Sequence, residues 1–219
     1  MTYLALFDCD GTLVDSQANI CMAMEHAFGA LSLPAPPRNR IRRIVGLSVF
    51  EAASALIPDA AYDVQLELSE QYKSAFHKLR HDGLIEEPLY DGIGQLLGAL
   101  SAANWALGVA TGKSDRGLDN CLNHHGIRSQ FVTLQTADRH PSKPHPAMVR
   151  QAIKEAQSTA EHTAMIGDTT YDMLMGKAAG CCTIGVSWGY HPVDELRMAG
   201  ADAIAETMDE LQHYLEGMR

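Results

Sequence analysis

Short apolar runs alternate with amphipathic segments from about residue 91 to the C-terminus. The runs have four to six residues, as buried strands do; they are Ala106–Ala110, Phe131–Leu134, Thr163–Ile166, Cys181–Val186 and Ala201–Ile204. The intervening segments have helical spacing; they are Gly92–Ala103, Ser114–His125, Pro146–Ala156, Tyr171–Ala179 and Val193–Ala199. Gly126, Gly180 and Gly200 follow three of these segments, where a left-handed residue often ends a helix. Repeated strand–helix units predict a parallel sheet covered by helices on both faces.

The segment from about Ala18 to about Arg80 has a different pattern of apolar and polar residues. It lacks strand alternation and carries two apolar stripes at helical spacing. The stripes are Ile20, Met24, Ala27, Phe28 and Leu31, and then Tyr62, Leu66, Ser69, Tyr72, Phe76 and Leu79. Because the apolar run Tyr3–Phe7 precedes this segment and belongs with the later strands, the helices are an insertion. We therefore predict an α/β fold: a Rossmann-like, doubly wound parallel sheet over residues 1–15 and 88–219, with a small helical domain and its linkers over 16–87.

Composition narrows the class of partner. A formal charge of −10 argues against a general nucleic-acid binder, which needs a basic face. No apolar run approaches the roughly 20 residues that span a bilayer, and no signal peptide is recognised at the start. The five cysteines are odd in number and lack Cys-x-x-Cys spacing, which favours a reducing compartment. We expect a cytoplasmic monomer or homodimer that binds a small metabolite, with no nucleic-acid or membrane partner.

Polar residues follow the predicted strands at the positions where chemistry is expected. In doubly wound sheets, ligands bind outside the carboxyl ends of the strands. Two carboxylates follow the first predicted strand, and two more follow the fourth. A hydroxyl and a glycine follow the second strand. A lysine stands before a proline at the start of a predicted helix. These residues are Asp8, Asp10, Thr111, Gly112, Asp168, Asp172 and Lys143.

Each residue type in this group suits phosphoryl transfer. Clustered carboxylates repel one another, and Mg²⁺, which prefers oxygen ligands, is the natural compensating cation. Asp8 could attack phosphorus, and Asp10 could protonate the leaving oxygen and later activate water. The hydroxyl of Thr111, the N–H groups after it and the ammonium of Lys143 could hold phosphate oxygens. Phosphoryl transfer needs mainly such positioning and charge stabilisation.

Four motifs in order resemble the signatures of the haloacid dehalogenase-like phosphatases. They are Asp8-x-Asp10-Gly11-Thr12-Leu13-Val14-Asp15-Ser16, then Thr111-Gly112, then Lys143-Pro144, then Gly167-Asp168-x-x-x-Asp172. The resemblance implies that Asp8 is the nucleophile and Asp10 the acid/base, with Thr111 and Lys143 as phosphate ligands. It also implies a magnesium ion held by Asp168, Asp8 and the carbonyl of Asp10. For Asp172 two alternatives remain open: support of the metal through a water molecule, or pairing with Lys143.

The helical insertion resembles the small cap domain of this family. Residues 41–48 read as a helix–loop junction, and in capped relatives this part of the cap can reach the substrate. Arg42 and Arg43 are therefore candidates for binding a substrate carboxylate or phosphate. The alternative is a basic helix end that complements the helix dipole.

The expected function is magnesium-dependent hydrolysis of a small phosphomonoester through an aspartyl-phosphate. The run from Asp10 to Ser16 most resembles phosphoglycolate phosphatases, but Gln17-Ala18-Asn19-Ile20 follows it without the Pro-Asp of that group. Phosphoglycolate is the leading substrate, with pyrophosphate, sugar phosphates and nucleoside monophosphates left open. The alternatives are a phosphomutase and a non-enzymatic phosphate-sensing module, and the second would be expected to lack Asp8 or Asp10. A true dehalogenase is disfavoured because it needs neither Asp10 nor magnesium.

Overall fold

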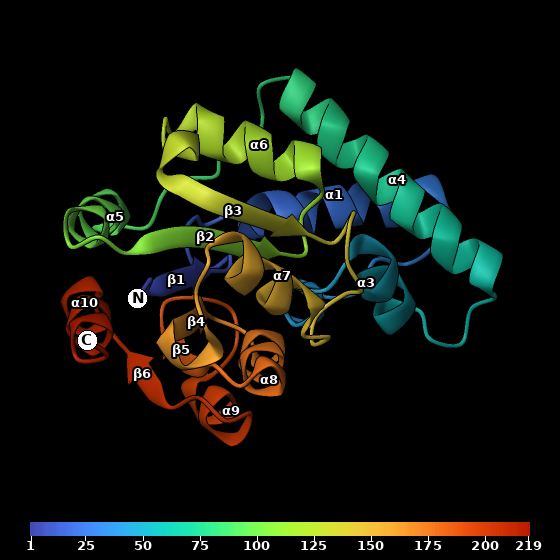
Figure 1. Cartoon of the computed structure of the whole chain (residues 1–219). Helices are drawn as coiled ribbons and strands as arrows, with labels where there is room; N and C mark the ends of the chain where they lie inside the picture. The colour runs from blue at the N-terminus through green and yellow to red at the C-terminus, as the bar shows by residue number, and fades with distance from the viewer.

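A six-stranded parallel sheet forms the centre of the molecule in the computed structural model, which describes residues 1–219 (Figure 1). The strands follow the order β3-β2-β1-β4-β5-β6, and each neighbouring pair is parallel. They are β1 (Leu4–Phe7), β2 (Ala106–Thr111), β3 (Phe131–Thr136), β4 (Thr163–Gly167), β5 (Cys182–Val186) and β6 (Ala203–Ala205). This order confirms the predicted Rossmann-like doubly wound fold, in which the chain reverses direction across the sheet at β1.

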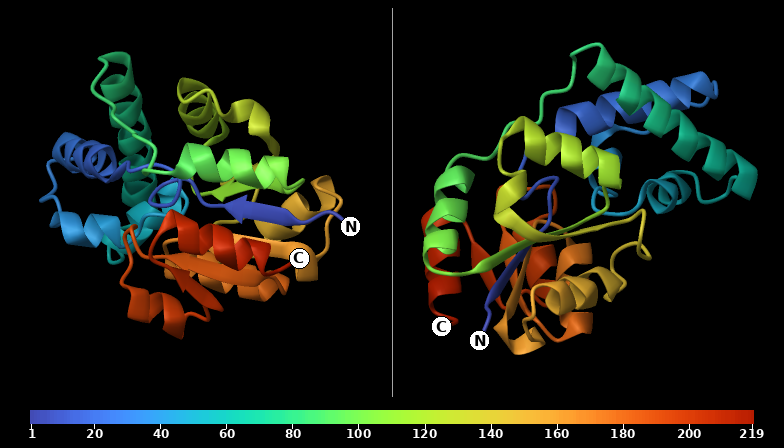
Figure 2. Two further views of the ribbon diagram at one scale, coloured as in Figure 1. Left: turned by 90° about the vertical axis from the view of Figure 1, so that its left-hand side faces the viewer. Right: turned by 45° about the horizontal axis from the view of Figure 1, so that its top comes forward.

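Helices cover both faces of the sheet because its strands are apolar on both sides. In β1, Ala5 and Phe7 join the core cluster of one face, and Leu4 and Leu6 join that of the other. Helices α5 (Ile93–Ala102), α6 (Asp115–His124) and α10 (Met208–Glu216) cover the first face. Helices α7 (Ala147–Glu155) and α8 (Thr170–Ala179) cover the second, and α9 (Val193–Met198) packs beside α8 (Figure 2).

The ends of these elements agree closely with the sequence patterns. Gly126, Gly180 and Gly200 have φ of 66°, 80° and 100°, as the left-handed positions after three helices require. Strands β2 and β3 extend past their apolar runs, because Thr111 still pairs with Thr136 at the end of the ladder. The chain also forms two short 3₁₀ turns, Arg128–Gln130 and Ala160–His162. None of its helices combines the length and apolar character needed to cross a membrane.

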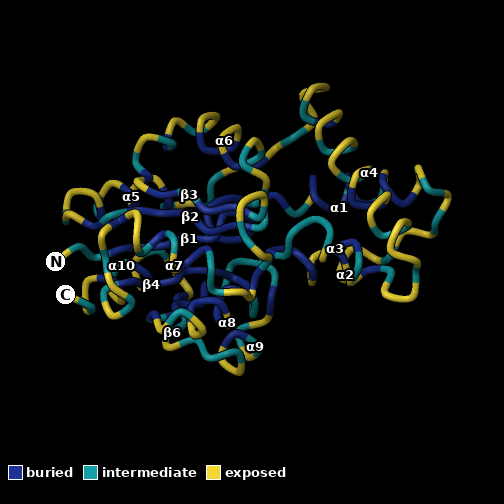
Figure 3. Tube along the Cα trace, turned by 45° about the vertical axis from the view of Figure 1, so that its right-hand side comes forward, coloured by how far each residue is buried: buried dark blue, intermediate teal, exposed yellow.

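The chain segment between β1 and α5 forms four helices that pack together as a separate unit. They are α1 (Gln17–Ala30), α2 (Arg38–Arg42), α3 (Val49–Leu56) and α4 (Tyr62–His81). Their apolar residues form a core of their own, in which Met24 and Phe28 of α1 meet Leu68 of α4. Figure 3 shows these helices beside the sheet, with exposed residues along their outer faces. We call α1 to α4 the cap.

The predicted apolar stripe of α4 is wrong in its first two turns. Tyr62 and Leu66 are exposed, whereas Leu68 is fully buried. The N-terminal turn of α4 packs beside α3, where the ring of Tyr62 lies 5.2 Å from that of Phe50. From Ser69 to Leu79 the predicted stripe is buried or half-buried, so only the two N-terminal turns depart from the face that the spacing indicated.

The two connections between cap and sheet run side by side. The N–H of Asp15 donates to the carbonyl of Pro88 (2.9 Å), and the N–H of Tyr90 donates to the carbonyl of Leu13 (3.0 Å). Both hydrogen bonds lie close to the boundaries predicted at 15/16 and 87/88. The division into a core (1–15 and 88–219) and a cap with linkers (16–87) remains our interpretation of the chain.

Candidate active site

Three predicted carboxylates meet at the carboxyl ends of β1 and β4. Asp8 follows β1 and Asp168 follows β4, and these strands are neighbours, with Phe7 paired to Ile166. Asp172 joins them from the first turn of α8. One oxygen of each of the three carboxylates lies within 4.8 Å of the others, and all three residues are buried. The parallel ladder thus brings Asp8 close to Asp168, which is 160 residues later in the chain.

The ammonium of Lys143 lies inside this carboxylate group. Its Nζ is 2.8 Å from Oδ1 of Asp8 and 2.7 Å from Oδ1 of Asp172. Burial alone would lower the pKa of Lys143, but the two carboxylates outweigh it and raise this pKa above its ordinary value. The other oxygen of Asp172 accepts hydrogen bonds from the N–H and hydroxyl of Thr169, in a capping box of α8. Asp172 thus pairs with Lys143, as one of its two predicted roles requires.

Asp8 keeps one carboxylate oxygen unpaired. Its Oδ1 accepts from the N–H of Cys9 (2.7 Å) and contacts Lys143, whereas its Oδ2 is buried without any hydrogen-bond partner. Burial, opposed by Lys143, raises the pKa of Asp8 to about 7. A buried oxygen without a partner is costly unless something else binds it.

Two hydrogen bonds orient the carboxylate of Asp168, and no cationic side chain forms an ion pair with it. It accepts hydrogen bonds from the hydroxyl of Thr12 (2.9 Å) and the N–H of Tyr190 (2.9 Å). Burial is the main cause that raises its pKa well above the ordinary range, and the negative charges of Asp172 and Asp8 add to it. A Cβ on Gly11 would lie 2.2 Å from Oδ2 of Asp168, so a glycine is required there.

These features fit a divalent cation that prefers oxygen ligands. The three carboxylates of Asp8, Asp168 and Asp172 carry more negative charge than the single ammonium of Lys143 compensates. Mg²⁺ takes one or two protein carboxylates and fills its other positions with water and substrate oxygens. Asp8 and Asp168 are thus the residues that would hold it, and the family resemblance adds the main-chain carbonyl of Asp10.

Asp10 lies at the boundary between sheet and cap. Its carboxylate is 2.9 Å from the ammonium of Lys113 and accepts a hydrogen bond from the hydroxyl of Ser16. Lys113 also contacts Glu87 (2.7 Å), which in turn pairs with Arg80 of the cap (2.6 Å). Sequence reasoning missed the roles of Lys113, Glu87 and Ser16. Lys113 directly follows the Thr111-Gly112 motif, which is a usable signal, whereas Glu87 stands in a linker without a motif.

Thr111 and Gly112 lie at the carboxyl end of β2, as predicted. Thr111 is buried, and its hydroxyl accepts from the N–H of Lys113 (3.2 Å). A Cβ on Gly112 would come within 2.4 Å of the carbonyl oxygen of Leu47 and 2.7 Å of that of Gly46. The backbone of the cap therefore lies directly on this motif, and the cap is closed over the core.

The structure does not bring Arg42 or Arg43 to the site. The guanidinium of Arg43 pairs with Glu195 of α9 at 2.7 Å, on the outside of the junction between cap and core. Both arginines are exposed, and neither lines the cavity beside Asp10. The predicted loop of the cap does reach the Thr111-Gly112 motif, but it does so through the backbone of Gly46 and Leu47 rather than through these side chains.

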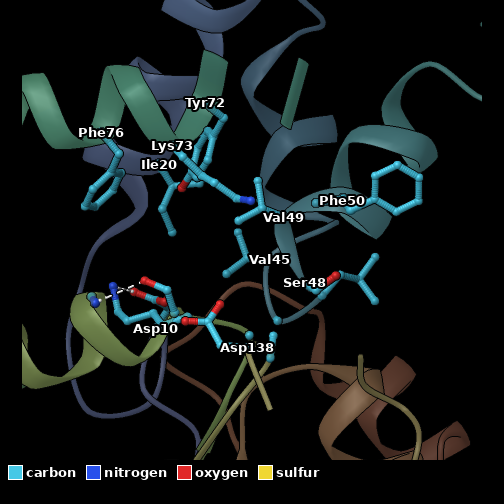
Figure 4. A pocket seen from close by; sticks show the side chains of 18 of the residues that line it. Asp10, Ile20, Val45, Ser48, Val49, Phe50, Tyr72, Lys73, Phe76 and Asp138 are labelled. Atoms are coloured by element: carbon cyan, nitrogen blue, oxygen red, sulfur yellow. Dashed lines mark hydrogen bonds and ion pairs between the residues drawn. The ribbon is translucent and has the colours of Figure 1, made fainter. Parts of the chain in front are cut away.

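A cavity of about 590 Å³ lies between cap and core, with Asp10 in its wall (Figure 4). The cap supplies mainly apolar side chains, and the core supplies residues after β2 and β3. In Figure 4 the side chains of Val45, Val49 and Tyr72 lie across the cavity from Asp10 and Asp138. Asp10, Gly112 and Lys113 line this cavity, whereas Asp8 and Asp168 lie buried behind them and do not line it.

Comparison with known proteins agrees with the motifs and the geometry. Residues 5–186 match the family model described as haloacid dehalogenase-like hydrolase. The chain is 36% identical to Probable phosphatase IndB of Dickeya dadantii, over 96% of this chain and 92% of that protein. It is 29% identical to phosphoglycolate phosphatase of Vibrio parahaemolyticus, over 95% and 93%. The crystal structure of a hydrolase from Pseudomonas syringae matches with a TM-score of 0.86 and 25% identity, over 99% of both chains. This chain belongs to the haloacid dehalogenase-like hydrolases.

Proposed function

We propose that this chain is a magnesium-dependent phosphatase that hydrolyses a small phosphomonoester through an aspartyl-phosphate on Asp8. The observation that carries the proposal is the buried Oδ2 of Asp8, which has no hydrogen-bond partner and belongs to a carboxylate oriented by Lys143 and the N–H of Cys9. An oriented nucleophile with one free oxygen is what attack on phosphorus requires. Membership of the hydrolase family and the phosphatase names of its relatives support the same reaction.

In the proposed mechanism, the reaction consists of two successive displacements at phosphorus. In the first, Oδ2 of Asp8 forms a bond to phosphorus, the bond to the ester oxygen breaks, and Asp10 donates a proton to the departing oxygen. In the second, Asp10 takes a proton from water, the water oxygen bonds to phosphorus, and the bond to Asp8 breaks. Phosphate leaves and both carboxyl groups return to their starting states. Lys143 and Thr111 hold the phosphoryl oxygens throughout. Magnesium, when bound by Asp8 and Asp168, supplies charge neutralisation for the phosphoryl group.

Phosphoglycolate is the first substrate to test, because relatives of similar length carry that name. Sugar phosphates, nucleoside monophosphates and pyrophosphate complete the panel. A phosphomutase would convert a sugar phosphate into an isomer without releasing phosphate, so product analysis separates the two activities. We further propose a cytoplasmic enzyme, in keeping with its five free cysteines, that acts on a small phosphorylated metabolite as a monomer or homodimer.

The direct test is phosphate release by the wild-type protein and by Asp8→Asn, measured over this panel with magnesium and again with a chelator. We expect Asp8→Asn to lose at least about 100-fold in rate, because removing a covalent nucleophile costs several powers of ten. Asp209→Asn on the exposed side of α10 is the matched control and should retain full activity. Activity of Asp8→Asn above about one per cent of wild type, or turnover that resists the chelator, would overturn the proposal.

A further inference from the structure

The cavity beside Asp10 is much larger than a two-carbon leaving group needs. Its volume is about 590 Å³, within the range of pockets that hold drug-sized ligands. A water molecule occupies about 30 Å³ of liquid, so a leaving group of a few atoms would leave most of this space to solvent. The wall opposite Asp10 is apolar and comes from three segments of the cap. Its side chains include Ile20, Met24, Val45, Val49, Tyr72 and Phe76.

Positive charge gathers in the same cavity although the chain as a whole is acidic. Four cationic side chains and one histidine line it, against the carboxylates of Asp10 and Asp138. Three of the cations already have carboxylate partners: Lys73 pairs with Glu70, and both Arg80 and Lys113 pair with Glu87. The fourth, Arg116 of α6, forms no ion pair.

The only side chain that Arg116 contacts through a hydrogen bond is His77 of the cap. A guanidinium has no acceptor, so it donates to Nε2 of His77, which must then be unprotonated at that nitrogen. One side chain comes from the core and the other from the cap, so the pair forms where the two parts meet. Arg116 is an exposed residue at the edge of the cavity, and it makes no other side-chain hydrogen bond or ion pair, so its remaining donors are free for a ligand.

We propose that Arg116, oriented by His77, binds an anionic group of the leaving group, and that the apolar wall of the cap covers the body to which this group is attached. The substrate class is then a phosphomonoester whose leaving group combines an apolar or aromatic body with a carboxylate or a similar anion. This inference rests on the proposed phosphatase function and narrows it. Phosphoglycolate has the carboxylate but lacks the apolar body.

Binding of phosphonates tests the inference without turnover, since a phosphonate has no ester bond to break. With magnesium present, calorimetry would compare phenylphosphonate, 3- and 4-phosphonobenzoate, and phosphonoacetate. We expect the better phosphonobenzoate to bind at least about tenfold more tightly than phenylphosphonate, as a charge-assisted hydrogen bond predicts. It should also bind more tightly than phosphonoacetate, which offers a carboxylate without an apolar body.

Arg116→Ala should remove the advantage of the carboxylate, and His77→Ala should reduce it. Arg128→Ala makes the same change of charge at an exposed site outside this cavity and should keep the advantage. Equal affinity for phenylphosphonate and the phosphonobenzoates in the wild-type protein would overturn the inference. So would equal losses in Arg116→Ala and Arg128→Ala. If the wild type releases phosphate from the panel but shows no carboxylate advantage, only this inference fails. If no phosphonate binds and no phosphate is released, the proposed function fails with it.

Discussion

The ammonium of Lys113 lies 2.9 Å from Oδ1 of Asp10. The same ammonium contacts Glu87, and Glu87 pairs with Arg80 at the end of α4. Lys113 and Glu87 are almost inaccessible to solvent, with 9% and 4% of their side chains exposed, so these ion pairs are little screened by water. A continuous set of charged contacts therefore joins the cap to the residue that we assign as acid/base. We therefore expect Lys113 to act on the reaction by positioning Asp10.

Removing this ammonium should impair protonation of the leaving oxygen. We expect Lys113→Met to lower kcat/KM for an alkyl phosphate by about 10- to 100-fold, the value of one charge-assisted contact. 4-Nitrophenyl phosphate needs little protonation of its leaving oxygen, so its hydrolysis should suffer less. Steady-state kinetics on both substrates measures the difference, with exposed Lys78→Met as the control. Equal losses on the two substrates would indicate a purely structural role for Lys113.

We expect closure of the cap over the core to be most sensitive to an added methyl group at Gly112. Since a Cβ there would lie 2.4 Å from the carbonyl oxygen of Leu47, Gly112→Ala must push the cap loop away or prevent it from docking. We expect a loss of at least about tenfold in kcat/KM, because small displacements at a closing site are costly. Gly98→Ala, where a Cβ meets nothing within 4 Å, is the control and should keep full activity. Unchanged kinetics in Gly112→Ala would mean that the cap does not need to dock in this position.

The sequence alone predicts the sheet, the inserted helices and the residues at the strand ends. It does so because strand–helix alternation and the four motifs are local signals, and parallel pairing then brings Asp8 and Asp168 together without further information. What it could not predict depends on how cap and core dock. Glu87 and Arg116 have no local signal, and their contacts with Lys113 and His77 exist only once the two parts meet. The place of Arg42 and Arg43 in a cap loop makes them candidates, but the direction of a side chain at a helix end depends on tertiary packing.

Arg43 offers a direct check on that correction. Its ion pair with Glu195 is partly exposed, and such pairs contribute only about 0–1 kcal/mol. We expect Arg43→Ala to change kcat/KM by less than about fivefold, and by the same factor on a carboxylated aryl phosphate and on 4-nitrophenyl phosphate. Kinetics on this substrate pair gives the answer. A selective loss on the carboxylated substrate would restore Arg43 as a substrate ligand and would count against Arg116.

The buried carboxylates should make the metal-free protein less stable as pH rises. The pKa of Asp8 is raised from 3.8 to about 7 on folding, mainly by burial, so the folded state holds this proton more tightly than the unfolded state does. Stability from this group is therefore greatest below about pH 4 and is lost as pH rises through the window from about 4 to about 7.

In chelator, we expect the free energy of unfolding, measured with urea, to fall between pH 5 and pH 8, and to fall less in Asp8→Asn, which cannot ionise. Saturating magnesium should reduce the fall in the wild type, because a cation bound only by the folded state stabilises it and favours the charged carboxylates. Asp168 should keep part of the slope in Asp8→Asn, since burial raises its pKa in the same direction. Identical slopes for the wild type and Asp8→Asn in chelator would show that Asp8 is not protonated in the folded protein. The absence of any magnesium effect on either slope would remove Asp8 and Asp168 as its ligands.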